Sequence, residues 1–131
     1  MIGLDTNILV RYLAQDDPEQ SPRATHIIER RLSEDRQGFI SLITIVETVW
    51  VLDRVYGLSR LVIANAVERM LQADTLLIQN EQEVFTAMAA LKSGIGSFSD
   101  ALIGALGAWA GCDATLTFDK KAARLGGFEL A

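Results

Sequence analysis

Four acidic residues stand out because they lie among apolar neighbours instead of in polar segments: Asp5, Glu47, Asp100 and Asp119. Asp5 and Asp119 end short runs that we predict to be strands. Glu47 and Asp100 fall in the first turns of predicted helices. Because the carboxyl ends of parallel strands share one edge of a sheet, we expect the four carboxylates to converge there.

Converging carboxylates repel one another, so such a site needs either protonation or a bound cation. Oxygen ligands without a nearby His or Cys favour Mg²⁺ or Mn²⁺ over zinc. A metal of this kind can activate water and shield a phosphate under attack. Asp5, Asp100 and Asp119, each taken alone, are better explained as helix caps or turn residues. The set of four favours a shared site.

The composition restricts the chemistry further. The chain has 131 residues, a net charge of −5, one His and one Cys. A single His disfavours metal-free RNA cleavage, which commonly uses two imidazoles. A single Cys cannot form an intramolecular disulfide or a zinc cluster. An acidic protein does not hold nucleic acid by bulk electrostatics, so we expect local cations to hold phosphate, with Arg11, Lys120 and Lys121 as candidates.

We derive the expected cellular location from the lack of a signal-peptide pattern and of a membrane-spanning stretch. The chain shows no signal-peptide pattern, and its longest charge-free stretch near the C-terminus, Ala101 to Cys112, is shorter than the about 20 residues of a membrane span. We therefore predict a cytoplasmic protein without membrane contact.

Predicted strands and helices alternate along the chain. The expected strands cover residues 1–4, 38–41, 75–78, part of 113–118, and 128–130. The expected helices cover 6–14, a segment opened by Ser21-Pro22, 44 (or 41) to 56, a segment opened by Ser59, 81–91, 97 (or 99) to 110, and 120–125. This order predicts an α/β fold with a mostly parallel sheet of four to five strands covered by helices on both faces. The length predicts a single domain over residues 1–131.

The ordered motifs resemble the PIN-domain family, which implies a three-layer fold. They are Leu4-Asp5-Thr6-Asn7, Ser41 with Val46-Glu47, Ser99-Asp100-Ala101-Leu102-Ile103 and Thr117-Phe118-Asp119. The stretch from Gly38 through Ser59 and the ending from Thr117 to Leu125 are most similar to the VapC-type toxin branch.

This resemblance implies a Mg²⁺- or Mn²⁺-dependent ribonuclease that leaves a 5′-phosphate and a 3′-hydroxyl. It maps Asp5, Glu47, Asp100 and Asp119 onto the family's catalytic acids, and we assign the metal to Asp5, Asp100 and Asp119. Thr6, Asn7 and Thr117 match the adjacent polar positions. Many relatives carry a further acid where this chain has Lys121, so the number of metals stays open.

The resemblance also implies a cognate antitoxin that occupies the active site. An acidic crevice favours the binding of a cationic side chain, so we expect the antitoxin to place an Arg or Lys among the four acids. The apolar helix around Trp50 and the segment from Leu58 to Leu71 lead us to expect a homodimer. Two alternatives remain: a non-enzymatic part of a DNA-binding regulatory complex, and an aspartyl phosphatase. The phosphatase is disfavoured because Asn7 stands where a second Asp is needed.

Overall fold

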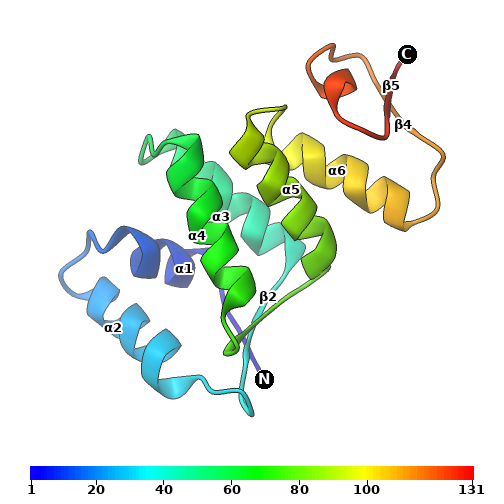
Figure 1. Cartoon of the computed structure of the whole chain (residues 1–131). Coiled ribbons are helices and arrows are strands. Elements are labelled where there is room, and N and C mark those ends of the chain that lie inside the picture. The colour runs from blue at the N-terminus through cyan, green and yellow to red at the C-terminus, as the bar shows by residue number, and fades with distance from the viewer.

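The computed structural model describes all residues from 1 to 131 (Figure 1). In chain order the elements are β1 (Ile2–Gly3), α1 (Thr6–Ala14), α2 (Gln20–His26), the π-helical turn η1 (Ile27–Arg31), β2 (Gly38–Ile40), α3 (Leu42–Arg54), α4 (Arg60–Gln72), β3 (Leu76–Ile78), α5 (Glu81–Ser93), α6 (Phe98–Trp109), β4 (Thr115–Thr117), the 3-10 helix η2 (Ala122–Arg124) and β5 (Phe128–Leu130). In Figure 1, α1 and α2 lie to the left, α3 to α5 form the middle, and α6 leads to the C-terminal strands.

The first sheet has three parallel strands in the order β1-β2-β3. Its register pairs Ile2 with Gly38, and Gly38 with Leu76. Burial alternates along its strands: Ile40, Leu76 and Ile78 are buried, whereas Leu77 is 36% accessible, so one face of the sheet is packed in the core more fully than the other. The apolar side chains of the core come from this sheet and from α1 to α6, and Leu9, Ile40, Ile45, Val67 and Met88 are almost wholly inaccessible to solvent.

A second, separate sheet pairs β4 with β5, again in parallel, with Thr115 opposite Phe128. We call residues 115–130, which hold β4, η2 and β5, the C-terminal unit. The unit packs on α6, where a Cβ added to Gly104 would come within 2.5 Å of the Phe128 ring. The helix therefore needs glycine at this position, because any larger residue would displace the ring. Leu125 of the same unit is buried in the main core.

These observations confirm the predicted α/β class with parallel strands and flanking helices. The expectation of one continuous sheet is wrong, because the five strands divide into a group of three and a group of two. Each strand is only two or three residues long. Local sequence indicates that such a segment is extended but does not determine which strand it pairs with. Here Phe128 packs against α6, and Leu125 is buried in the main core.

Two local features also differ from the expected elements. The second helix begins at Gln20, and the side chain of Asp17 accepts the backbone N–H groups of Glu19 and Gln20 there. That helix then continues as the π-helical turn η1. None of the helices combines the length and the apolar character needed to cross a bilayer.

Candidate functional site

The site begins where β1 ends. Asp5 is the N-cap of α1, with an extended backbone, and its carboxylate accepts the backbone N–H of Thr6 at 2.7 Å. A carboxylate at this position is favoured by the positive end of the helix dipole. Asp5 itself is exposed, whereas Thr6 is buried. The cap therefore holds the backbone of Asp5 and Thr6 in place, while the Asp5 side chain is exposed to solvent.

The second acid is brought to Asp5 by α3. Ser41 caps this helix, and its hydroxyl accepts the backbone N–H of Thr44 at 3.2 Å. The second turn of this helix presents Glu47, whose carboxylate accepts a hydrogen bond from the buried hydroxyl of Thr6. Thr6 and Glu47 are 41 residues apart in the chain. Their contact joins α1 to α3 and holds one oxygen of Glu47 in place.

These residues line an open cavity of about 480 Å³. Its walls are formed by Asp5, Thr6, Asn7, Val10, Arg11, Glu47, Trp50, Val51, Val55 and Tyr56. The cavity thus contains two of the four predicted acids, both of the polar residues that follow Asp5, and one of the three predicted cations. It also contains exposed aromatic surface, because Trp50 is 56% accessible.

The guanidinium of Arg11 already has hydrogen-bond partners within the protein. Its guanidinium donates to Asp16 at 3.2 Å, to the Tyr56 hydroxyl at 3.0 Å and to the Gln20 side chain at 2.9 Å. The Tyr56 hydroxyl in turn donates to Asp16 at 2.6 Å, and this bond is the main reason that the pKa of Asp16 lies below its usual value. Arg11 therefore ties α1 to the loop before α2 and to the end of α3. Its expected contact with phosphate stays a prediction.

Asp100 lies in the first turn of α6 and is half-buried. Ser97 caps this helix, and its hydroxyl accepts the backbone N–H of Asp100 at 3.1 Å. The neighbouring Ser99 shares an almost wholly apolar groove with Glu47. The groove runs between α3 and α6 and is lined by Leu42, Ile43, Val46, Glu47, Trp50, Ser99, Leu102, Ile103 and Leu106. The start of α6 therefore borders the helix that carries Glu47.

The fourth acid lies elsewhere, in the C-terminal unit. Asp119 is exposed, its backbone N–H donates to the Thr117 hydroxyl at 3.0 Å, and its carboxylate accepts the backbone N–H of Lys121 at 2.8 Å. Lys120 and Lys121 are exposed as well. Thr117 thus adjoins Asp119 as expected, but these four residues belong to the C-terminal unit and not to the cavity of Asp5.

The structure therefore assembles part of the expected site. It gathers Asp5, Thr6, Asn7 and Glu47, and it contains no cluster of three or more acids, His or Cys arranged to hold a metal. None of the four acids is neutralised by an ion pair, since the ion pairs present are Arg11–Asp16, Arg54–Asp53 and Lys92–Glu68. Free carboxylates suit Mg²⁺ or Mn²⁺ chemically, and the metal assignment to Asp5, Asp100 and Asp119 stays a prediction.

The apolar helix face predicts that Trp50 makes a core or dimer contact. The structure excludes the core, because this side chain is 56% accessible beside Glu47, and the dimer contact stays a prediction. The signal was present in the spacing, because residues three apart on a helix lie on the same face. Tyr56 was also missed. Its hydrogen bonds reach residues 40 and 45 positions away, and no local pattern indicates such contacts.

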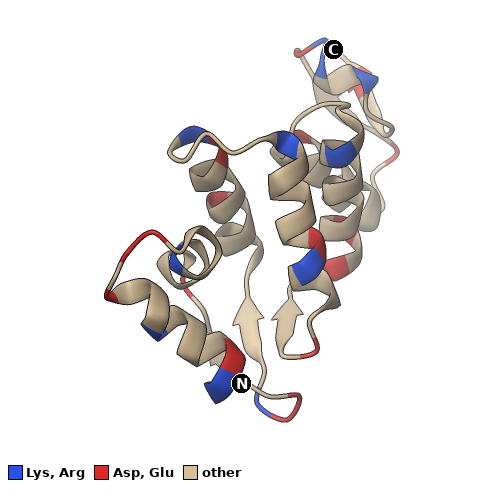
Figure 2. Ribbon diagram, turned by 60° about the vertical axis from the view of Figure 1, so that its left-hand side comes forward, with Lys and Arg blue, Asp and Glu red and all other residues tan.

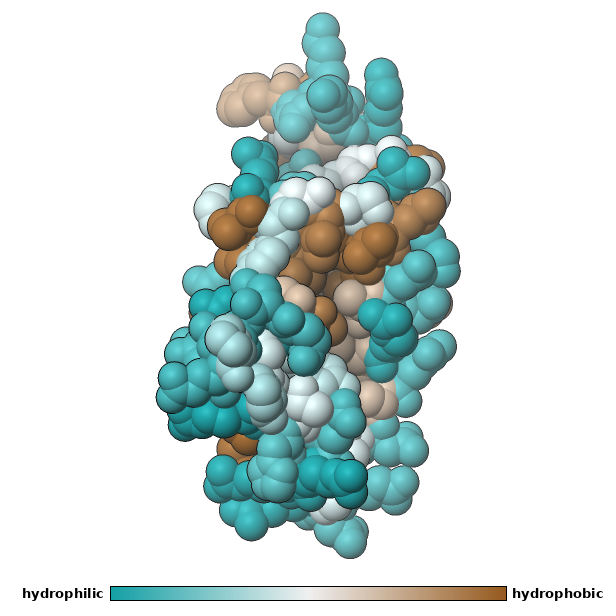
Figure 3. Space-filling view, turned by 90° about the vertical axis from the view of Figure 1, so that its left-hand side faces the viewer, coloured by the Kyte–Doolittle hydropathy of each residue, from teal (hydrophilic) through white to brown (hydrophobic).

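Charge is dispersed over the remaining surface. In Figure 2 the basic and acidic segments are scattered over helices and loops, and no element is basic along its length. Figure 3 shows the side of the molecule that lies to the left in Figure 1. It is largely hydrophilic, with apolar atoms showing in a hollow. Figure 2 shows no broad basic stripe that would hold nucleic acid by bulk electrostatics, in agreement with the net charge of −5.

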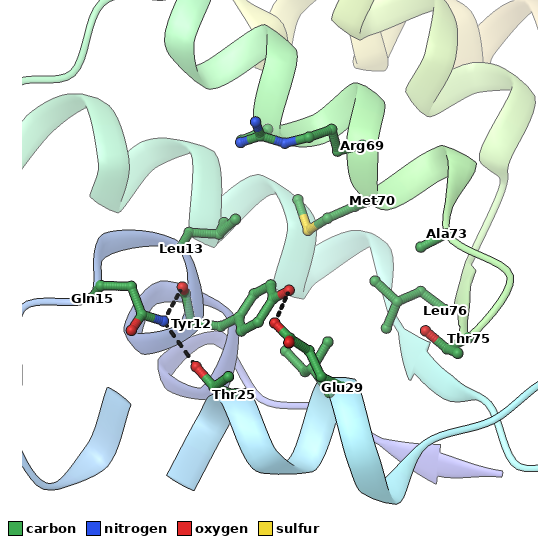
Figure 4. A pocket seen from close by; sticks show the side chains of 12 residues that line it. Tyr12, Leu13, Gln15, Thr25, Glu29, Arg69, Met70, Ala73, Thr75 and Leu76 are labelled. Atoms are coloured by element: carbon green, nitrogen blue, oxygen red, sulfur yellow. Dashed lines mark hydrogen bonds between the residues drawn. The ribbon is translucent and has the colours of Figure 1, made fainter. Parts of the chain in front are cut away.

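Another cavity, of about 660 Å³ and thus larger than the one at Asp5, contains none of the predicted site residues (Figure 4). It lies between α1, α2 with η1, and α4, close to the start of β3. Four of its polar side chains already bond in pairs: the Tyr12 hydroxyl donates to Glu29 at 3.0 Å, and the Gln15 amide donates to Thr25 at 3.0 Å. Burial, followed by the contact with Glu29, raises the pKa of Tyr12. No unsatisfied buried polar atom marks this cavity as a ligand site.

The chain matches the family model of the PIN domain over residues 2–127. That range covers nearly all of its length, so the chain belongs to the PIN domain family. Comparison with curated proteins and with solved structures found no match. PIN domains are typically nucleases, and a nuclease is therefore the class of enzyme to which this family assignment points.

Proposed function

We propose that this protein is an endoribonuclease that depends on Mg²⁺ or Mn²⁺ and acts as the toxin of a toxin–antitoxin pair. The observation that carries the proposal is the pair Asp5 and Glu47, joined through Thr6 in an open cavity where neither acid forms an ion pair. Membership of the PIN family supports a nuclease. The resemblance to VapC-type toxins supports RNA as the substrate.

Each residue of the proposed site has its own role. Thr6 holds one oxygen of Glu47, so the other oxygen can orient the attacking water and take its proton. Asp5, with Asp100 and Asp119, would hold the metal, which supplies charge stabilisation at the phosphate when bound. The amide of Asn7 can donate to a phosphate oxygen. The exposed Trp50 offers a surface on which a base can stack.

A cleavage assay with labelled RNA tests the proposal. We expect purified protein to cut RNA in Mn²⁺ or Mg²⁺ and not in EDTA, with 5′-phosphate and 3′-hydroxyl ends. The variant Asp5→Asn should lose the activity. Asp53→Asn is the matched control, because Asp53 is an exposed acid on α3 that pairs with Arg54 outside the cavity. Cleavage that survives EDTA or Asp5→Asn would contradict the proposal.

The partner of the proposed toxin is an antitoxin that places an Arg or Lys among the acids. Acids without internal ion pairs favour such a cation. We expect Asp100→Asn to weaken antitoxin binding, and more strongly at low salt because exposed charges are less screened there. The affinity of the variant for its cognate antitoxin, measured at low and high salt, provides the test. Unchanged affinity at both salts would exclude recognition of this carboxylate.

A further inference from the structure

A small cavity lies directly beside the cavity of Asp5 and Glu47. It has a volume of about 160 Å³ and lies between α1 and α2, which pack side by side (Figure 1). Most sites for small molecules have volumes of about 300–1,000 Å³, so this smaller cavity suits a compact group such as a phosphate. We call it the arginine pocket, after Arg11 and Arg23 in its lining.

Two helices bring the polar side chains of the arginine pocket together. Asn7 and Arg11 lie four residues apart on α1, and Gln20 and Arg23 lie three residues apart on α2. Residues three or four apart on a helix share a face, so each helix turns one polar pair toward the other helix. Apolar side chains complete the lining. The pocket is therefore a product of regular helix geometry and not of a loop.

The arginine pocket and the neighbouring cavity differ in the sign of their charge. The pocket is lined by two arginines and no acid, whereas Asp5 and Glu47 line the neighbouring cavity. Arg23 is exposed and takes part in no ion pair, even with Glu19 one turn before it. An unpaired guanidinium has a positive charge and several free N–H donors. It therefore favours an oxyanion such as phosphate.

Arg11 contributes to the pocket in a fixed orientation. Its Nε donates to Gln20 at 2.9 Å, and its Nη1 donates to Asp16 at 3.2 Å and to the Tyr56 hydroxyl at 3.0 Å. These bonds hold the plane of the guanidinium and use Nε and Nη1, so Nη2 is the donor that is left for a ligand. Arg11 can thus donate to an anion without losing its contacts within the protein.

The arginine pocket is continuous with the acidic cavity. Asn7 and Arg11 line both of them, and the Asn7 side chain is exposed. A ligand that extends from Asp5 to Arg23 therefore passes over Asn7. RNA has phosphates at regular intervals along its backbone, so one strand can place one phosphate beside the acids and another beside the arginines.

We propose that the arginine pocket binds a backbone phosphate of the RNA, next to the phosphate that is cleaved at Asp5 and Glu47. Arg23 supplies the uncompensated positive charge, Arg11 donates from Nη2, and Asn7 lies between the two phosphates. The role of this subsite in cleavage rests on the proposed nuclease function, whereas the binding of a phosphate does not. A protein with a net charge of −5 can hold RNA in this way without a broad basic surface.

Binding of a labelled single-stranded RNA in EDTA tests the subsite without cleavage. For single strands, each neutralised phosphate adds about 0.7 to the slope of log affinity against log salt concentration. We expect Arg23→Gln to reduce this slope by about 0.7 and to weaken binding about fivefold at about 0.1 M salt. Arg23→Lys retains the charge and should retain the slope. Fluorescence anisotropy over a series of salt concentrations measures both quantities.

Arg36→Gln is the matched control, because it removes the same charge elsewhere. Arg36 is exposed, takes part in no ion pair and precedes β2. It therefore lies at the amino edge of the parallel sheet, whereas Asp5 follows the carboxyl end of β1. The control should bind RNA like the wild-type protein. Equal weakening by Arg23→Gln and Arg36→Gln, or no weakening by Arg23→Gln, would overturn the proposal. Melting curves establish that each variant is folded.

Steady-state cleavage separates the subsite from the chemistry. Arg23→Gln should raise KM by a factor similar to its loss of affinity and change kcat little, because the pocket holds its phosphate equally in the substrate and the transition state. Asp5→Asn should instead abolish cleavage. If the wild-type protein cuts RNA and Arg23→Gln retains its KM and affinity, the subsite is wrong and the nuclease stands.

The opposite result is also distinguishable. If the wild-type protein binds RNA through Arg23 but cuts none in Mn²⁺, the proposed function fails and the phosphate subsite stands. Absence of RNA binding by the folded wild-type protein, at low salt as well as high, would overturn the subsite.

Discussion

At the scale of single side chains, the hydrogen bond from Thr6 to Glu47 joins α1 to α3 at the candidate site. Thr6→Val keeps the shape of the side chain but removes the donor. We expect the free energy of unfolding to fall by about 0.5–1.5 kcal/mol, the usual net value of such a bond. Cleavage should fall further, because Glu47 loses its fixed orientation. Urea denaturation and the RNA assay measure the two effects.

Thr86→Val provides the control for this variant. Thr86 is exposed on α5, and its hydroxyl donates to the Gln82 carbonyl within the same helix. The substitution should leave cleavage unchanged. If Thr6→Val matched Thr86→Val in both stability and cleavage, the hydrogen bond to Glu47 would have no role in either.

Asp16 and Asp17 make the free energy of unfolding depend on pH. The hydrogen bond from Tyr56 lowers the pKa of Asp16 below its usual 3.8, and the backbone N–H groups of Gln20 and Glu19 do the same for the pKa of Asp17. Their folded-state pKa values lie below the unfolded ones. Their contribution is therefore complete above the unfolded pKa and is lost as the pH falls through the folded values.

Tyr56→Phe should reduce this loss, because Asp16 then loses its strongest partner. We expect a smaller decline in the free energy of unfolding between about pH 5 and pH 3 than in wild-type protein. Urea denaturation across this range is the measurement. In an Asp16→Asn background, Tyr56→Phe should have no further effect on the pH dependence, and a persisting effect would assign the role to another group.

At the scale of elements, serine caps begin the helices that carry or flank the site. Ser97 accepts from Asp100 at 3.1 Å on α6, and Ser59 accepts from Val62 at 3.2 Å on α4. Ser97→Ala and Ser59→Ala should each cost about 1 kcal/mol of stability. Only Ser97→Ala should also lower cleavage, because its helix holds Asp100 in the first turn. Equal cleavage by both variants would remove Asp100 from the machinery.

Sequence reasoning predicted these helices well because caps and periodicity are local signals. Ser41, Ser59 and Ser97 each cap a helix where the pattern indicates one. The π-helical turn over Ile27–Arg31 has no signal in its residue types. The contact between Thr6 and Glu47 spans 41 residues and depends on how helices pack. The place of β4 and β5 depends on the packing of Phe128 against Gly104 and of Leu125 in the main core, which are contacts between distant parts of the chain that local patterns do not indicate.

At the scale of the whole molecule, metal binding should stabilise the folded protein. A metal present at 100 times its dissociation constant adds about 2.7 kcal/mol through mass action. We expect melting curves in Mn²⁺ to lie above those in EDTA, and Asp5→Asn to reduce the difference. Asp53→Asn should retain it, because Asp53 pairs with Arg54 away from the cavity. No difference at millimolar Mn²⁺ in free protein would contradict a shared metal site.

The division into two sheets also sets an order of events during synthesis on the ribosome. All three strands of the first sheet are complete by Ile78, whereas β4 begins only at Thr115. Amino-terminal regions generally fold first as a chain emerges. Asp5 and Glu47 can therefore meet while Asp119 is still inside the exit tunnel. The two acids of the Asp5 cavity are thus in place before the C-terminal unit, which carries Asp119, has formed its own sheet.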